Sequence, residues 1–244
     1  MGRIFITGSA DGLGLLAAKS LIAKGHQVVV HARNEKRKLE GLGDVKGLEG
    51  IVIGDLSNLE ETNDLAKQVN DLGSFDAIIH NAGLYQAASS DIFSVNTLAP
   101  FVLTSLINKP KRIIYLSSDM HRQGRPTIDF SKRGIEKISY SDSKFHVLML
   151  SLIVARKWED VYSNAVDPGW VPTKMGGKSA PENLDKGYET QVWLAENDDQ
   201  QAKVSGRYFY HKTESKYKSE AGLISFQEEF INACQEISGV EFPG

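Results

Sequence analysis

Short apolar runs alternate along the chain with longer segments in which apolar residues recur every three or four positions. The short runs are rich in Ile, Val, Phe and Tyr, as strands are, and cover residues 3–7, 27–32, 50–54, 75–80, 112–118, 161–166 and 206–211. Helical spacing covers residues 13–25, 58–72, 91–107, 140–158, 184–196 and 223–237.

This alternation predicts an α/β fold in which right-handed crossovers build a doubly wound parallel sheet of about seven strands, with helices on both faces. No repeat, low-complexity tract or long linker divides the chain, so we expect one domain. Two looser stretches, residues 122–139 and 174–187, each follow a strand, where such a sheet places its ligand. They are candidate lids, and exposed loops without a role are the alternative.

The composition is ordinary for a globular protein, with 41% hydrophobic and 24% charged residues. A net charge of −3 gives no reason to expect nucleic acid or an anionic membrane as a partner. Cys234 is the only cysteine, which excludes an internal disulfide, disfavours a zinc site and suits a reducing compartment. The apolar pattern starts at the N-terminus and never reaches the roughly 20 residues that span a bilayer. We therefore expect a cytoplasmic protein without a metal.

A glycine-rich loop, TGSADGLG at residues 7–14, follows the first predicted strand. Gly8, Gly12 and Gly14 let the chain turn sharply and bring the next helix close to the strand. Amide groups in the first turn of that helix, such as that of Leu13, can then hold a pyrophosphate. The spacing G-x-x-x-G-x-G differs from the common dinucleotide fingerprint, and a plain tight loop is the alternative. Because the loop joins the first strand to the first helix, we expect it to bind phosphate.

The second predicted strand ends in HARNEKRK, residues 31–38. NAD-selective sites place Asp or Glu here, whereas an Arg suits the 2′-phosphate of NADP. Ala32 leaves the acidic position empty and Arg33 follows it, with a guanidinium group that fits a phosphate dianion. We therefore expect NADP(H) rather than NAD, with Arg33 as the principal phosphate ligand and Ser9 as a helper. A solvated arginine at a strand end is the alternative.

Two short motifs, GDLSN and HNAG, follow the third and fourth predicted strands. Asp55, beside Leu56, can accept a hydrogen bond from an adenine amino group. Asn81, Ala82 and Gly83 are small enough for a cofactor to approach their backbone closely. Each motif alone is ordinary turn chemistry. The carboxyl ends of parallel strands share one edge of the sheet, so we expect both motifs at the cofactor site.

The stretch YSDSK places Tyr140 and Lys144 four positions apart in a predicted helix, so that the phenol and the ammonium group lie on one face. A free phenol has a pKa of about 10, and a nearby cation lowers it toward the range of a usable acid and base. Ser118, at the end of the fifth strand, can hold a substrate oxygen. Asn96 can order a water beside Lys144. A solvated pair without a role is the alternative.

In order and type, TGSADGLG, HNAG, SVN, YLSS, YSDSK and DPGWVPT resemble the motifs of the short-chain dehydrogenase/reductase superfamily across nearly the whole chain. The resemblance implies a single-domain Rossmann fold over residues 1–244, with the catalytic site built in. It implies a catalytic tetrad of Asn96, Ser118, Tyr140 and Lys144. It also implies a nicotinamide-side loop that includes Pro168, Gly169, Val171 and Thr173. The wide separation of Ser118 from Tyr140, with PGWVPT, resembles the retinol dehydrogenase and WW-domain oxidoreductase branch.

The activity that this resemblance implies is reversible hydride transfer between NADP(H) and a carbonyl or secondary alcohol, with Tyr140 as acid and base. A small-molecule carbonyl or alcohol is then the expected partner. An NADPH-binding regulator or scaffold of the same fold is the alternative, although Ser118 and Tyr140 together favour an enzyme. Trp170 can line the substrate site or pack in the core. The helices at 91–107 and 140–158 can form a homo-oligomer interface or lie buried in a monomer.

Overall fold

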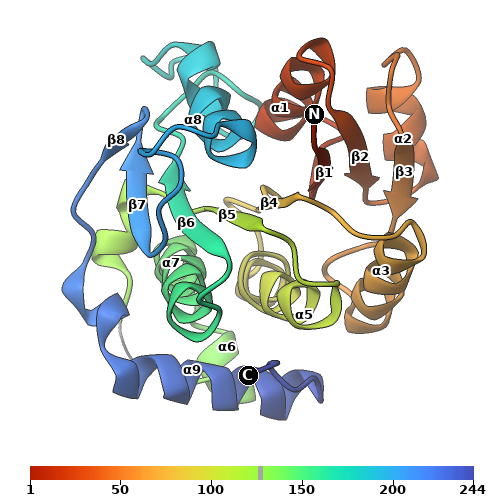
Figure 1. Cartoon of the computed structure of the whole chain (residues 1–244). Coiled ribbons are helices and arrows are strands. Elements are labelled where there is room, and N and C mark those ends of the chain that lie inside the picture. The colour runs from red at the N-terminus through yellow and green to blue at the C-terminus, as the bar shows by residue number, and fades with distance from the viewer. Residues whose placement is uncertain (126–128) are drawn as a thin grey trace.

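One sheet runs through the molecule in the strand order β3-β2-β1-β4-β5-β6-β7-β8 (Figure 1). A computed structural model describes residues 1–125 and 129–244. Neighbouring strands are parallel except for β7 and β8. The strands are β1 (Arg3–Ile6), β2 (Gln27–Ala32), β3 (Gly50–Ile53), β4 (Ala77–His80), β5 (Arg112–Leu116), β6 (Tyr162–Asp167), β7 (Arg207–Tyr210) and β8 (Thr213–Glu214). The doubly wound sheet is therefore confirmed, with one short antiparallel strand added at its edge.

Helices cover both faces of the sheet (Figure 1). One layer holds α1 (Gly12–Ala23), α2 (Glu35–Leu42) and α8 (Leu184–Glu196). The other holds α3 (Leu59–Asp71), α4 (Ser89–Phe93), a π-helical turn (Ser94–Leu98), α5 (Ala99–Leu106) and α7 (Tyr140–Lys157). Outside this second layer lies α9 (Ile224–Ser238). Short 3-10 turns (Asp119–Gln123, Ser219–Gly222) and α6 (Lys132–Ile135) complete the described elements.

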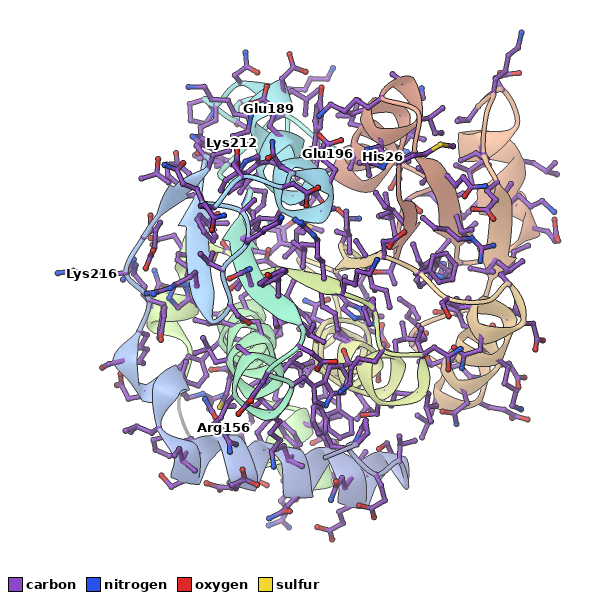
Figure 2. The ribbon with its side chains drawn as sticks, viewed as in Figure 1. His26, Arg156, Glu189, Glu196, Lys212 and Lys216 are labelled. Carbon is purple, nitrogen blue, oxygen red and sulfur yellow. The ribbon has the colours of Figure 1, made fainter. Side chains whose placement is uncertain are left out.

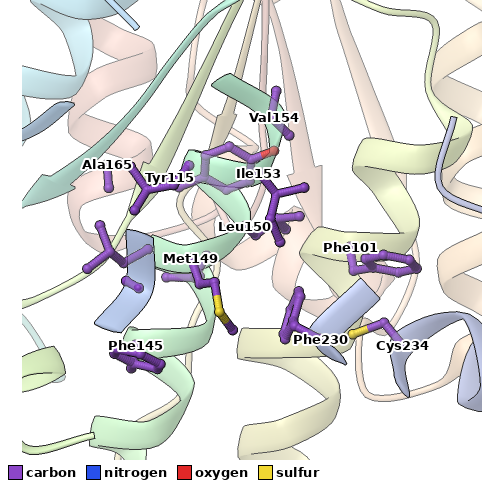
Figure 3. Close-up of a cluster of buried hydrophobic side chains, with 14 of the residues drawn as sticks. Phe101, Tyr115, Phe145, Met149, Leu150, Ile153, Val154, Ala165, Phe230 and Cys234 are labelled. Carbon is purple, nitrogen blue, oxygen red and sulfur yellow. The ribbon is translucent and has the colours of Figure 1, made fainter. Parts of the chain in front are cut away.

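The core lies between the sheet and each helical layer. In the layer of α7, buried side chains from α5, α7, α9, β5 and β6 form one cluster, which includes Phe101, Tyr115, Phe145, Phe230 and Cys234 (Figure 3). The strands of the sheet centre are buried on both faces, which explains why their sequences read as continuous apolar runs rather than as alternating ones. Burial of this extent is the main stabilising term for the fold.

Several elements differ from the sequence-based expectation. The helix α2 was not predicted, because its sequence EKRKLEGL buries only Leu42. The predicted helix at 91–107 begins earlier, at Ser89, and is interrupted by the π-helical turn. Within the candidate lid at 122–139, residues 126–128 lie outside the described residues, and α6 occupies part of the remainder.

Charged pairs on the surface fix α8 to its neighbours (Figure 2). Glu196, at the end of α8, contacts Lys24 and lies 2.8 Å from Nε2 of His26, in the turn between α1 and β2. At the other side of α8, Glu189 lies 3.2 Å from Lys212 in the turn between β7 and β8. The helix is thereby tied to the turn between α1 and β2 and to the turn between β7 and β8.

The helix α7 has little apolar surface left for a second subunit. Every residue from Ser141 to Val154 is buried within the single chain. Phe230 of α9 packs on Phe101, and Phe242 stacks on Trp158, so that the C-terminal segment covers this layer. Residues 141–154 of α7 are therefore buried inside the chain, and the homo-oligomer interface stays a prediction.

Candidate active site

The glycine loop is held between the two strands that flank β1. The side-chain amide of Asn81 donates to the carbonyl oxygens of Thr7 and Gly8, at 3.0 and 3.1 Å. The Thr7 hydroxyl accepts from the amides of Asn81 and Ala82. A Cβ atom on Gly14 would lie 2.4 Å from the Asn81 side chain, and one on Gly8 would lie 2.7 Å from Cα of Ala82. Only glycine fits at these two positions, so the loop passes close to both the helix and the neighbouring strand.

Ser9 is not available to a ligand, which corrects the expected role of its hydroxyl. The side chain is fully buried. Its Oγ donates to the carbonyl of Ile6 and accepts from the amide of His31. With both bonds made inside the protein, Ser9 supports the loop and does not reach a 2′-phosphate.

Arg33 lies just beyond the end of β2 and is exposed to solvent. Its side chain is 59% exposed, and Nε lies 4.0 Å from a carboxylate oxygen of Asp55. The other oxygen of Asp55 accepts from the amide and hydroxyl of Ser57. Leu56 is buried in the apolar cluster of the α3 layer, so only its backbone can face a ligand. The guanidinium group is therefore free to meet an anion, with Asp55 beside it.

Arg37 is a second cation at this place that sequence reasoning missed. It lies in the first turn of α2, where Asn34 caps the helix by accepting from the Arg37 amide. Its guanidinium group contacts the carboxylate of Asp11 in the glycine loop, and Lys174 approaches the same oxygen at 3.3 Å. The only available signal was the density of basic residues in HARNEKRK.

Tyr140 and Lys144 share one face of α7, as their spacing predicts. Tyr140 is the first residue of the helix, directly after the cap Ser139. The Lys144 ammonium group lies 5.4 Å from the centre of the Tyr140 ring and donates to the carbonyl of Leu116, at the end of β5, at 2.8 Å. Lys144 is only 5% exposed. Burial holds the lysine in place, so the pair is not a solvated one.

The two groups have shifted pKa values, and one shift is opposite to expectation. Burial raises the pKa of Tyr140, and the charge of Asp167 and the neighbouring Tyr85 raise it further, while Ser118 opposes them. Burial lowers the pKa of Lys144 to about 8, against the opposing effect of Asp167. The expectation of a lowered phenol pKa is wrong for this structure, because burial and the Asp167 carboxylate raise the pKa of Tyr140. Tyr140 is thus a neutral phenol at neutral pH.

Ser118 and Asn96 approach this pair from two other elements. Ser118 follows β5 and caps the 3-10 turn that comes next, and its hydroxyl is close enough to Tyr140 to lower the phenol pKa. Asn96 lies in the π-helical turn, a feature frequent at functional sites. Its side chain bonds both backbone groups of Leu84 and donates to the Ser143 hydroxyl at 3.0 Å.

Gly83 lies between the side chains of Lys144 and Asn96. A Cβ atom there would stand 3.4 Å from the Lys144 ammonium nitrogen and 3.6 Å from Oδ1 of Asn96. All four residues expected in the tetrad therefore converge at the carboxyl edge of the sheet, beside the HNAG motif.

The segment after β6 closes the site on the side of α8. Leu13 of the glycine loop and Val171 both approach Gly187 of α8, where a Cβ atom would lie 3.0 Å from either side chain. Pro168 and Gly169 begin the segment, and the Thr173 hydroxyl accepts from the amide of Gly176. The nicotinamide-side loop expected from the sequence therefore adjoins the glycine loop.

Glu182 holds the same segment at its tip. Its carboxylate accepts from the amide of Trp170 at 2.7 Å and from the Tyr210 hydroxyl at 2.9 Å. Trp170 is 55% exposed, which excludes the core-packing alternative for this residue. Tyr85, which packs on Tyr140 with ring centres 4.9 Å apart, is also exposed. Three exposed aromatic rings, those of Tyr85, Trp170 and Tyr210, thus lie at or just beyond the carboxyl ends of β4, β6 and β7.

Asp167, at the end of β6, is the other functional candidate that sequence reasoning missed. It is 7% exposed, and its two oxygens accept from the amides of Gly169 and Asp119, at 2.9 and 3.0 Å. Burial raises its pKa. The carboxylate ties the start of the nicotinamide-side loop to the turn that follows Ser118. Its position before PG in the motif DPGWVPT was visible in the sequence, but its burial was not.

The model of the short chain dehydrogenase family matches residues 3–184. The chain therefore belongs to the short-chain dehydrogenase family. An uncharacterized oxidoreductase of Emericella nidulans, AN7799, is 42% identical over the full length of both chains. The short-chain dehydrogenase chry4 of Gibberella zeae is 38% identical over all of this chain and 99% of its own. Human retinol dehydrogenase 14 is 26% identical over 84% of this chain and 76% of its own, consistent with the branch resemblance.

Solved structures of low sequence identity have the same fold. A structure of an uncharacterized protein from Mycobacterium paratuberculosis has a TM-score of 0.81 at 19% identity and covers 100% of this chain and 96% of that one. A short-chain dehydrogenase of Escherichia coli CFT073, solved in complex with NADPH, has a TM-score of 0.68 at 24% identity, with 86% and 96% covered. These neighbours confirm the Rossmann-like architecture of the family member described here.

Among residues 1–125 and 129–244, no three His, Cys, Asp or Glu side chains gather so that they could hold a metal ion. Over the same residues, no helix combines the length and apolar character needed to cross a bilayer.

Proposed function

We propose that this short-chain dehydrogenase is an NADP(H)-dependent oxidoreductase that moves a hydride between nicotinamide and a carbonyl or secondary alcohol. The observation that carries the proposal is the convergence of four side chains beside the glycine loop: Asn96, Ser118, Tyr140 and Lys144. We further propose that residues 1–244 act as one cofactor-binding unit with the catalytic site built in.

The residues at the carboxyl edge of the sheet fit a dinucleotide. The close packing at Gly8 and Gly14 brings the first turn of α1 next to the loop, and amide groups such as that of Leu13 have no acceptor within a helix at this position. Asp55 and the backbone of Leu56 would serve the adenine end. Asn81, Ala82 and Gly83 would line the centre, and Pro168, Gly169, Val171 and Thr173 the nicotinamide end.

The preference for NADP(H) rests on charge. The exposed guanidinium group of Arg33 would bind the 2′-phosphate, and Arg37, close by in α2, would add a second positive charge. At the position where an Asp or Glu side chain would favour NAD, this chain has Ala32, which carries no carboxylate. The E. coli structural neighbour solved with NADPH supports this choice.

When bound, NADPH would supply the hydride. The raised pKa of Tyr140 keeps its phenol protonated near neutral pH, so it is suited to donate a proton to the substrate oxygen in the reducing direction. The Ser118 hydroxyl would hydrogen-bond the same oxygen as negative charge develops on it. Lys144, with a pKa of about 8, stays largely charged and would favour the phenolate that remains. Asn96 would fix Leu84 and the start of α7 around them.

The expected partner is a small molecule that carries a carbonyl or an alcohol. Tyr85, Trp170 and Tyr210 would contact it, since their exposed rings lie at or just beyond the carboxyl ends of the strands and the ring of Tyr85 packs on Tyr140. Aromatic side chains bind apolar and planar groups well.

The test is the Tyr140→Phe variant, assayed with NADPH against a panel of aromatic and aliphatic ketones and aldehydes. Loss of the proton donor should reduce kcat by about 10²- to 10⁴-fold, the range typical of a general acid. The affinity for NADPH should stay within about two-fold, because the phenol hydroxyl contributes little to cofactor binding. Fluorescence titration checks the second point.

Tyr162→Phe is the matched control, because it removes a hydroxyl from an exposed ring at the start of β6, at the opposite end of this strand from Asp167. It should retain most of the activity. Turnover of Tyr140→Phe at the wild-type rate would contradict the proposed mechanism, whereas failure of the wild-type protein to bind NADPH would contradict the choice of cofactor.

A further inference from the structure

The imidazole ring of His31 lies beneath the glycine loop and joins it to the end of a neighbouring strand. His31 belongs to β2 and is almost completely buried. Its Nδ1 accepts from the amide of Gly8 at 2.9 Å, and its Nε2 lies 2.8 Å from the carbonyl oxygen of Gly54, just past β3. The ring therefore spans three adjacent segments: the loop after β1, its own strand, and the end of β3.

These two contacts determine the protonation state of the ring. A backbone amide is a donor, so Nδ1 must be an acceptor and carries no proton. A carbonyl is an acceptor, so Nε2 must carry the proton. The ring is thus the neutral Nε2–H tautomer. Burial, which lowers the pKa of His31 despite opposing contributions from the Gly54 hydrogen bond and from Asp55, favours the same neutral state.

The backbone of His31 holds the same loop. Its carbonyl accepts from the amide of Ser9 at 3.1 Å, and its amide donates to the Ser9 hydroxyl at 2.8 Å. Ala82 packs against the opposite side of Gly8, which has a positive φ of 62°. The first residues of the loop are therefore enclosed between β2 and β4, and the ring of His31 supplies their only side-chain acceptor on the β2 side within the described contacts.

We propose that His31 is a positioning residue for NADP(H) binding, in which the neutral Nε2–H imidazole links the Gly8 amide to the Gly54 carbonyl and so fixes the glycine loop in its phosphate-binding shape. This inference rests on the proposed function, because it assumes that the loop binds the cofactor. It assigns a role to β2 itself, beside that of Arg33 just past the strand. The ring touches no cofactor and acts only through the loop.

Two isosteric variants separate the two ends of the ring. In His31→Asn, the side-chain oxygen can occupy the position of Nδ1 and keep the acceptor for Gly8. In His31→Gln, the side-chain nitrogen can occupy the position of Nε2 and keep the donor to Gly54, while the Gly8 amide loses its partner. Both variants lose one buried hydrogen bond, so both should unfold at a lower temperature than the wild-type protein.

The readout is the dissociation constant for NADPH, measured by tryptophan quenching, beside the unfolding temperature. We expect His31→Gln to bind NADPH about ten-fold or more weakly than the wild-type protein and His31→Asn to bind within about three-fold of it. Equal affinity in all three proteins would overturn the proposal, as would an equal loss in both variants, which would indicate a merely structural role. If the wild-type protein does not bind NADPH, the proposed function fails first, and that result is read separately.

A second measurement serves if a variant does not fold. The nitrogen chemical shifts of the His31 ring in the wild-type protein, measured by NMR at pH 7, report which ring nitrogen carries the proton. We expect an unprotonated Nδ1 and a protonated Nε2, as the contacts with the Gly8 amide and the Gly54 carbonyl require. The opposite tautomer, or a charged ring, would overturn the proposal.

Discussion

Asp167 is a buried carboxylate that influences the whole candidate catalytic centre. It receives two backbone hydrogen bonds, from the turn after Ser118 and from the loop that begins at Gly169. Its charge raises the pKa of Tyr140 and opposes the lowering of the pKa of Lys144 by burial. In the proposed mechanism, Asp167 keeps the phenol protonated and the ammonium group charged.

Asp167→Asn removes this charge and keeps an acceptor for one of the two backbone amides. Because Asp167 raises the pKa of Tyr140, its removal should lower that pKa. In the reducing direction the acid form of Tyr140 is required, so the alkaline limb of the kcat profile should move to lower pH. The measurement is the pH–rate profile with a ketone that the panel identifies. Asp119→Asn, at an exposed neighbouring carboxylate, is the control, and a profile of Asp167→Asn that overlays the wild-type one would contradict the account.

At the residue scale, the sequence was informative where chemistry depends on spacing along one element. Tyr140 and Lys144 are four positions apart on a helix, so their common face could be predicted. Asp167, His31 and Arg37 act through contacts between elements distant in the sequence, which periodicity does not reveal. The burial of Ser9 under the loop depends on tertiary contacts of the same kind. The sequence alone therefore does not show that its hydroxyl is out of reach of a ligand.

At the scale of elements, strong periodicity predicted the long helices and the central strands, while weak or short segments were missed. The helix α2 is mostly charged and buries one leucine, and β8 consists of two exposed polar residues. The π-helical turn around Asn96 could not be predicted, because its sequence SVNTL suits an ordinary helix; in the structure Asn96 bonds Ser143 of α7.

The start of α7 is fixed by a capping box that also sets the position of Tyr140. The Ser139 hydroxyl accepts from the amide of Asp142, and the Asp142 carboxylate accepts from the amide of Ser139. Ser139→Ala should lower the free energy of unfolding by about 1 kcal/mol, the usual cost of losing an N-cap. Urea denaturation measures this loss.

Ser131→Ala is a matched control for the cap of α7, because Ser131 caps the single-turn helix α6 in the same way. Its loss should be smaller, since a helix of four residues contributes little to the rest of the structure. An unchanged stability of Ser139→Ala would show that the cap is not required.

At the scale of the whole molecule, four buried histidines lie in different parts of the fold. Burial lowers the pKa of His80 to about 3 and that of His146 to about 4, and it lowers the pKa values of His31 and His121 as well. In the unfolded chain all four return to a pKa of about 6.5. The unfolded state therefore binds more protons below this pH, and the native state is destabilised on acidification.

We expect the free energy of unfolding to be highest above about pH 6.5 and to fall as the pH decreases toward 5, by up to about 1.4 kcal/mol per pH unit for each histidine. Urea denaturation at a series of pH values measures the slope. His80→Gln can keep the contact of Nε2 with Thr104 and does not titrate. It should reduce the slope of the unfolding free energy by up to about 1.4 kcal/mol per pH unit, which is the contribution of one proton. A stability that is constant between pH 7 and 5 would contradict the burial of these rings as neutral groups.

The central claim, that this short-chain dehydrogenase uses NADP(H), is tested most directly by titrating the purified protein with NADPH and with NADH. Tryptophan quenching and energy transfer to the nicotinamide report both bindings. We predict that the wild-type protein binds NADPH at least about ten-fold more tightly, because Arg33 pairs with the 2′-phosphate. Arg33→Asp should lose this preference and keep its affinity for NADH. Equal affinity for the two cofactors in the wild-type protein, or an unchanged preference in Arg33→Asp, would contradict the claim.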